Sequence, residues 1–103
     1  MAKVAVIAKL MAAEGKRDAL VEALKGLVAG VQDEVGTLAY VLNTDAAAAD
    51  TVWFYELYTD QDALTAHSTS DTMKTVGREL APLMAGRPEV HVLTPVAGKG
   101  LDL

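Results

Sequence analysis

The chain has 103 residues, of which 51% are hydrophobic and 22% are charged, a composition typical of one soluble globular domain rather than a disordered segment. The formal net charge is −5 without any run of Lys or Arg, which argues against nucleic acid or an anionic membrane as a partner. The absence of cysteine excludes a disulfide framework and a thiolate site, and the amino-terminal apolar run, residues 4–10, is too short for a signal peptide or a membrane span. We expect a single cytoplasmic domain over residues 1–103.

Hydrophobic spacing predicts a strand over residues 3–11 and then a helix over residues 16–34. The first segment is short and rich in Val and Ile. In the second, Leu20 and Leu24 begin a series of apolar residues at helical spacing, and Gly36 follows as a stop signal.

Two glycines four residues apart, Gly26 and Gly30, lie inside the predicted helix. Each costs a helix about 1 kcal/mol relative to Ala. The pair indicates either a close neighbour on that helix face or simple tolerance of the cost.

Residues 37–44 and 52–58 are predicted to be two strands that pair as a hairpin through a polar loop. The window 53–58 holds four of the five aromatic residues of the chain. Because side chains alternate along a strand, one face of the second strand carries Val52, Phe54, Glu56 and Tyr58, and the other carries Trp53, Tyr55 and Leu57.

Capping residues predict where two further helical segments begin. A cap at residues 59–60 starts a short helix that carries Leu64 and His67 on one face. Ser70 can cap a second segment, in which Met73 begins another apolar series at helical spacing.

A final strand over residues 89–96 completes the order strand, helix, strand, strand, helix, strand. In a chain of this length, that order predicts an α+β, ferredoxin-like split βαβ fold: a four-stranded antiparallel sheet with helices on one face. The helices can cover only one face of the sheet, whereas the strand over residues 52–58 is apolar on both. We therefore expect Trp53, Tyr55 and Leu57 to form a homodimer interface in which two sheets pack face to face.

The other face of the aromatic strand predicts a small-molecule pocket. Phe54, Glu56 and Tyr58 should lie under the helices together with His67, whose imidazole can exchange a proton near neutral pH. The chain has no phosphate-binding glycine loop and only two histidines without ligand spacing, so we expect neither a nucleotide cofactor nor a metal site. The second histidine, His91, is interpreted as structural.

Structural roles for the same residues stay open. His67 can be a helix-terminal histidine that bonds a nearby carbonyl group. Glu56 can be a structural partner of Lys74, of Arg78 or of a helix amide. Tyr58 can pack at the strand end with its hydroxyl in water.

Three segments resemble a known family. Residues 36–40, residues 54–58 with the order aromatic-aromatic-Glu-Leu-aromatic, and residues 62–67 with Ala-His at their end are similar to the antibiotic biosynthesis monooxygenase (ABM) superfamily, which includes small quinol monooxygenases. The likeness extends from the first strand to Pro95. It implies a dimeric α/β barrel built from ferredoxin-like subunits, and oxygenation of an aromatic quinol or phenol by dioxygen without metal, flavin or haem.

The resemblance also implies roles for particular residues. A phenol that loses its proton in a dry pocket becomes electron-rich enough to reduce dioxygen, so the protein has to bind, orient, accept a proton and exclude water. On this basis catalytic roles fall to His67 and Tyr58, and substrate contacts to Glu56, Phe54, Tyr40, Leu64 and Met73.

The chain departs from some members of this superfamily. Haem-degrading members carry Asn, Trp and a haem-ligating His at the positions matching Ala8, Tyr58 and Gly77, so haem degradation is disfavoured. Several ABM oxygenases also rely on that Trp and Asn, so their mechanism cannot be carried over unchanged.

Two further hypotheses stand beside the oxygenase. Other relatives resemble an isomerase of a phosphorylated signal, which would work here by proton transfer through His67 and would need Lys74, Arg78 or Arg87 for the phosphate. The third hypothesis is a non-catalytic dimeric ligand-binding module.

Overall fold

One antiparallel sheet forms the base of the molecule in the computed structural model, which describes residues 2–103. Within these residues the sheet has four strands: β1 (Val4–Met11), β2 (Thr37–Thr44), β3 (Thr51–Tyr58) and β4 (Glu89–Leu93). Their order across the sheet is β2-β3-β1-β4, and every neighbouring pair is antiparallel. The sheet is open at β2 and β4, so a single chain does not close a barrel.

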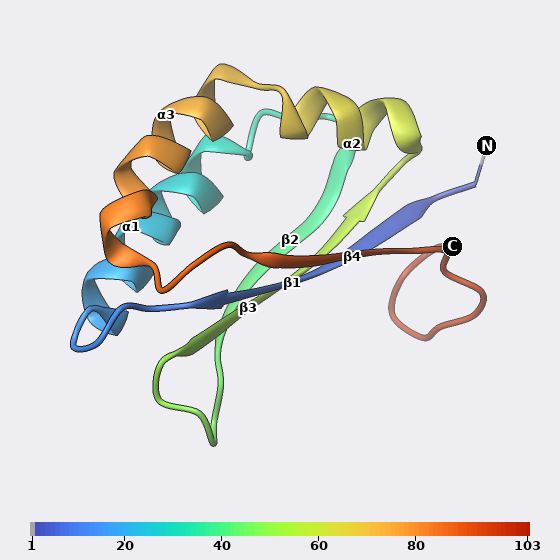
Figure 1. Ribbon diagram of the computed structural model, residues 1–103. Coiled ribbons are helices and arrows are strands. Elements are labelled where there is room, and N and C mark those ends of the chain that lie inside the picture. Colours follow the sequence, from blue (N-terminus) through green and yellow to red (C-terminus); the bar gives the residue numbers. More distant parts are fainter. Residues whose placement is uncertain (1) are drawn as a thin grey trace.

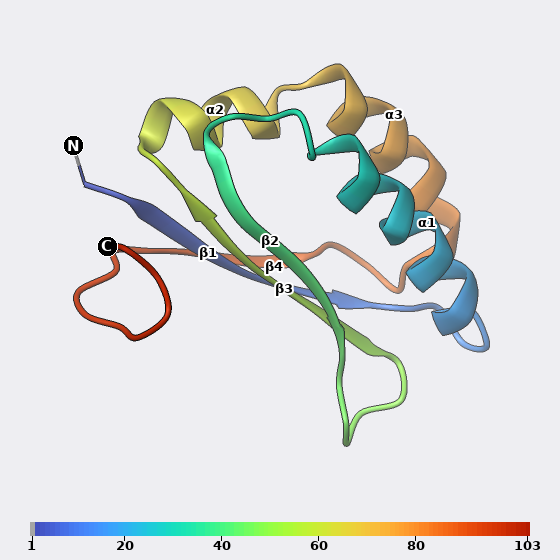
Figure 2. The same ribbon diagram turned by 180° about the vertical axis from the view of Figure 1, so that it is seen from behind.

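The helices lie together on one face of this sheet, as Figures 1 and 2 show from opposite sides. They are α1 (Arg17–Gly30), α2 (Gln61–Ser68) and α3 (Asp71–Leu80), and the short 3₁₀ helix η1 (Ala81–Leu83) follows α3 directly. The predicted ferredoxin-like α+β fold is confirmed. No helix among residues 2–103 is long and apolar enough to cross a membrane.

Two elements are shorter than predicted. Helix α1 ends at Gly30 rather than near Glu34, because Val31 turns inward and is buried, and the Gln32 side chain donates a hydrogen bond to the Val28 carbonyl at 3.0 Å. Strand β4 ends at Leu93 rather than Val96. Pro95 has no N–H group with which to continue the ladder.

The predicted helix caps lie where the sequence placed them. The side chain of Asp60 accepts a hydrogen bond from the Ala63 backbone N–H at 2.8 Å, and that of Ser70 accepts one from Met73 N–H at 3.2 Å. These bonds satisfy donors that a helix start leaves free. The caps fix where α2 and α3 begin, and α2 carries His67.

The hydrophobic core lies where α1 crosses the sheet. Leu20 and Leu24 of α1 and Val52 of β3 are all 0% exposed. Strand β4 lacks such cover, since Val90 and Val92 point to the helix side of the sheet yet are 56% and 59% exposed. The helical layer therefore leaves an opening along β4.

The outer face of the sheet is partly covered by the C-terminal tail. Figure 2 shows this tail turning back on the side away from the helices. Leu101 and Leu103 border the same shallow hollow as Tyr55 and Leu57. Leu57 is consequently only 5% exposed, which corrects the expectation that it is bare in a single chain.

Trp53 and Tyr55, on the same outer face, differ in their cover. The indole N–H of Trp53 donates a hydrogen bond to the Asp45 carboxylate at 2.7 Å, and the Lys9 ammonium lies 5.6 Å from the centre of the indole ring. Tyr55 is 48% exposed. Tyr55 is thus the residue of the predicted interface that is most open to a partner.

The two glycines of α1 have different surroundings. A Cβ atom added to Gly30 would lie 2.7 Å from the methyl carbon of Thr72 on α3, closer than real Cβ atoms approach other heavy atoms. A Cβ added to Gly26 would meet nothing within 4 Å. Close packing of α1 against α3 explains why glycine is needed at position 30. At position 26 the helix simply tolerates the cost of a glycine.

We expect Gly26→Ala to raise the free energy of unfolding by about 0.5–1 kcal/mol, because Ala favours the helix. Gly30→Ala should be less stable than Gly26→Ala by about 1 kcal/mol, because the new methyl group collides with Thr72. Urea unfolding of both variants measures this difference. Thr72→Ser removes the colliding methyl group, so adding it should recover most of the loss, and no recovery would contradict the packing explanation.

Candidate active site

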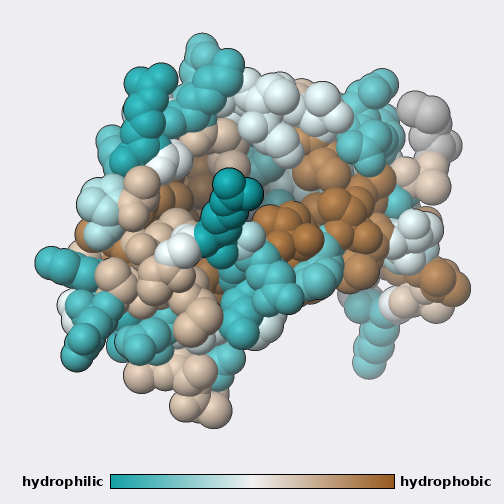
Figure 3. Space-filling model, viewed as in Figure 1, coloured by the Kyte–Doolittle hydropathy of each residue, from teal (hydrophilic) through white to brown (hydrophobic). Residues whose placement is uncertain are grey.

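A cavity of about 600 Å³ lies between the helical layer and the sheet. Figure 3 shows hydrophobic side chains gathered between the helices and the near edge of the sheet, where the surface is hollowed. Most of the lining of this cavity is apolar, and the lining comes from all four described strands and from α1, α2 and α3. Its side chains with polar groups are Tyr40, Glu56, His67, Ser68 and Arg87.

The structure brings six of the seven predicted site residues to this cavity. These are Tyr40, Phe54, Glu56, Leu64, His67 and Met73. The seventh, Tyr58, is 0% exposed and does not line the cavity. It lies next to the lining residues, with its ring centre 5.4 Å from that of His67.

His67 is held by a carboxylate from a distant part of the chain. Its ring nitrogen Nδ1 lies 2.8 Å from Oε1 of Glu34, and its side chain is only 3% exposed. A carboxylate can only accept, so Nδ1 carries the hydrogen and donates it. In the neutral ring the other nitrogen, Nε2, is then an acceptor that can take a proton. The ring does not bond a nearby carbonyl, which was the structural alternative.

Glu34 lies in the turn that follows α1. The hydroxyl of Thr37 donates a second hydrogen bond to Glu34 Oε1 at 2.7 Å, which orients the carboxylate. Helix α2 approaches this turn closely at Gly36, where an added Cβ would lie 2.5 Å from the Cβ of Ala63. Only glycine leaves room for this approach, and the approach brings His67 within reach of Glu34.

Sequence reasoning did not assign Glu34 to the site. The residue was placed at the end of a helix, and its partner is 33 positions away. The one local signal is an acidic residue in a glycine-containing turn directly before a strand. That signal is too common to indicate a site by itself.

Aromatic rings form the wall around the imidazole. The ring centre of Tyr40 lies 4.6 Å from that of Phe54 and 5.0 Å from that of His67. Burial raises the pKa of the Tyr40 hydroxyl well above its usual range, and the charges of Glu56 and Glu34 add to this effect. Tyr40 therefore keeps its proton and can donate a hydrogen bond to a ligand.

Glu56 has a neutral partner inside the protein. The Tyr58 hydroxyl donates a hydrogen bond to Oε1 of Glu56. Lys74 and Arg78, which were considered as its partners, are exposed on α3. Burial raises the pKa of Glu56, while the bond from Tyr58 and the nearby His67 act in the opposite direction. Tyr58 is thus buried with its hydroxyl paired, not in water.

His91 lies outside the cavity. It is exposed on the outer side of β4, where its Nε2 is 3.2 Å from a carboxylate oxygen of Glu89. Among residues 2–103, no group of three or more His, Asp or Glu side chains is arranged to hold a metal ion. Arg87 does line the cavity, although its predicted role was confined to a phosphorylated substrate.

Known proteins resemble this chain over most of its length. The family model described as antibiotic biosynthesis monooxygenase matches residues 3–78. A solved structure from Caulobacter crescentus, named as a candidate antibiotic biosynthesis monooxygenase, is 30% identical, with a TM-score of 0.88 over 93% of this chain and 92% of that one. None of the curated proteins compared is similar enough to count as a match.

Two other solved structures have similar scores. One, from Chloroflexus aurantiacus and with the same candidate name, is 29% identical, with a TM-score of 0.80 over 97% of this chain and 99% of that one. Another, from Mycobacterium tuberculosis, is 26% identical, with a TM-score of 0.86 over 95% of this chain and 99% of that one.

Replacing Glu56 by Gln should change how stability depends on pH. In the folded protein burial holds the pKa of Glu56 above its ordinary value of 4.5, so the folded state keeps this proton longer than the unfolded state as pH rises. The wild type should therefore lose stability relative to Glu56→Gln as pH rises from about 4.5 through the folded pKa, by about 1.4 kcal/mol for each unit of difference. Urea unfolding of both proteins between about pH 4 and pH 8 measures this. A stability difference that does not vary with pH would contradict the shift.

Proposed function

This chain belongs to the antibiotic biosynthesis monooxygenase family, and on that premise we propose that it is a cofactor-independent monooxygenase that oxidises a small aromatic quinol or phenol with dioxygen. One observation carries the proposal: a histidine whose Nδ1 is bonded to a carboxylate lines a largely apolar cavity. This arrangement supplies a base in a site from which water is largely excluded.

The base would act on the substrate hydroxyl. His67 Nε2 takes the proton, and the Glu34 carboxylate stabilises the positive charge that forms on the ring. The resulting phenolate is electron-rich and gives its electrons to dioxygen. For a hydroquinone, one oxygen atom enters the ring and the other leaves as water, so hydroquinone and dioxygen give a hydroxyquinone and water. The substrate supplies all four electrons, and no separate reductant is required.

The remaining side chains would hold the substrate in place. Phe54, Leu64 and Met73 supply apolar walls, and the protonated Tyr40 hydroxyl can donate a hydrogen bond to a substrate oxygen. Tyr58 does not line the cavity, so we assign it a positioning role through its hydrogen bond to Glu56. This differs from the catalytic role first predicted for it.

The isomerase hypothesis receives less support. A phosphorylated substrate would need several cationic ligands, and three basic residues late in the chain were considered for that purpose. Only Arg87 lines the cavity, whereas Lys74 and Arg78 are exposed on α3. A single guanidinium is a weak site for a phosphate dianion.

We expect His67→Ala to lower kcat for oxygen uptake with hydroquinones by about 100-fold, because it removes the base. Glu34→Gln should lower kcat by about tenfold, with KM little changed, because Gln keeps the hydrogen bond but loses the charge. An oxygen electrode measures both effects.

His91→Ala is the matched control and should keep full activity, since this surface histidine lies outside the cavity. Wild-type oxygen uptake equal to the buffer blank across a panel of hydroquinones would refute the oxygenase for those substrates. It would leave the non-catalytic binding module as the better hypothesis.

We also propose that the chain forms a homodimer through the outer faces of two sheets. Small proteins with this domain are typically dimers. Tyr55 is the aromatic residue most open on that face, with Trp53 beside it, whereas Leu57, the third residue of the predicted interface, is covered by the tail. An exposed aromatic surface on a sheet face fits a symmetric, self-complementary interface.

Tyr55→Glu should weaken the dimer at least tenfold, because the twofold symmetry would bring like charges close together in an apolar interface. Sedimentation velocity at micromolar concentration measures the effect. Val35→Glu is the matched control, because Val35 is 93% exposed in the turn after α1, away from this face. A wild-type protein that sediments as a compact monomer would contradict the proposed dimer.

A further inference from the structure

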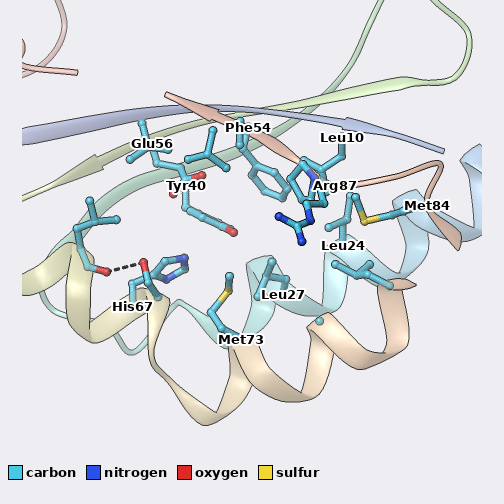
Figure 4. A pocket seen from close by; sticks show the side chains of 18 of the residues that line it. Leu10, Leu24, Leu27, Tyr40, Phe54, Glu56, His67, Met73, Met84 and Arg87 are labelled. Atoms are coloured by element: carbon cyan, nitrogen blue, oxygen red, sulfur yellow. Dashed lines mark hydrogen bonds between the residues drawn. The ribbon is translucent and has the colours of Figure 1, made fainter. Parts of the chain in front are cut away.

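One basic side chain stands out in the cavity. Among the described residues that line it, Arg87 is the only Lys or Arg. It lies in the turn between η1 and β4, after Gly86, whose φ of +95° is one that side chains other than glycine rarely adopt. Figure 4 shows its guanidinium pointing into the cavity, with Tyr40 and His67 on the other side.

No carboxylate of the described part of the chain neutralises Arg87 within ion-pair distance. The ion pairs among residues 2–103 are Arg17–Asp18, Lys25–Glu22, His67–Glu34 and His91–Glu89. Glu56, the acidic residue of the lining, is bonded to Tyr58 instead. In a chain whose net charge is −5, this guanidinium is a local positive charge directed at an apolar space.

The two polar ends of the cavity differ in exposure. His67 is 4% exposed, whereas Arg87 is exposed and lies on the open side with Val90 and Val92. A ligand that spans the cavity would place an uncharged hydroxyl at the buried end and a charged group near water. Keeping the charge near water avoids most of its desolvation cost.

We propose that Arg87 binds an oxyanion substituent of the substrate, of which a carboxylate is the simplest, so that the cavity selects an anionic aromatic compound. The planar guanidinium can donate two parallel hydrogen bonds to a carboxylate. Arg87 is then a specificity-determining residue at the mouth of the cavity. The placement of the substrate hydroxyl at the His67 end rests on the proposed function. The anion site at Arg87 does not, because it can be tested by binding alone.

The first test uses two fluorescent probes with the same aromatic skeleton. 8-Anilinonaphthalene-1-sulfonate carries one sulfonate, and N-phenyl-1-naphthylamine is the same compound without it. Arg87→Gln should raise the Kd of the sulfonate probe about fivefold and change that of the neutral probe less than about twofold. Arg87→Lys keeps the charge and should lie between the wild type and Arg87→Gln.

Two further variants locate the effect. Arg78→Gln is the matched control, because Arg78 is exposed on α3 and does not line the cavity, and it should bind both probes like the wild type. Gly77→Phe should weaken both probes, because Gly77 lines the cavity and has open space where a side chain would begin. Three results would each overturn the anion site: no sulfonate binding by the wild type, equal effects of Arg87→Gln on both probes, or sulfonate binding unaffected by Gly77→Phe.

The second test separates this inference from the oxygenase. With hydroquinone and 2,5-dihydroxybenzoate as substrates, Arg87→Gln should raise KM about fivefold for the carboxylated compound alone. If neither compound is oxidised, the oxygenase fails for them while the probe result still decides on Arg87. If both are oxidised and Arg87→Gln affects them equally, the oxygenase stands and the anion site is wrong.

Discussion

The hydrogen bond between His67 and Glu34 is the interaction on which the candidate site depends. It joins α2 to the turn after α1, so it ties two parts of the helical layer together over the sheet. It also sets the chemistry, because a carboxylate at Nδ1 leaves Nε2 as the acceptor. Thr37 orients the carboxylate, and Gly36 gives α2 the room to approach. Packing and the proposed proton transfer thus rely on the same contact.

Uneven cover of the sheet by the helices creates the cavity. Helix α1 fills the space over the sheet with Leu20 and Leu24, whereas β4 keeps its inward side chains exposed. The result is an apolar cavity with polar groups at two ends, His67 in the interior and Arg87 at the mouth. On the proposed function, this site distinguishes ligands by the positions of their polar groups, because its walls accept many apolar shapes.

The two faces of β3 have different environments although the strand is largely apolar throughout. On the inner face Phe54 lines the cavity, and Glu56 is paired with Tyr58 behind it. On the outer face the C-terminal tail covers Leu57 and leaves Tyr55 open. A substitution on one face should therefore affect ligand binding, and one on the other face association, with little overlap between them.

The sequence by itself determined the order of the elements, a cap at residues 59–60 and another at Ser70, and the alternation that directs Phe54 and Glu56 toward the helices. These features depend on neighbours within a few residues, so local spacing predicts them. Only the tertiary structure decided that Glu34 meets His67, that Tyr58 lies behind the cavity, that the tail covers Leu57, and that Arg87 enters the cavity beside β4. Each of these contacts joins residues from separate elements, and no local pattern encodes how those elements come together.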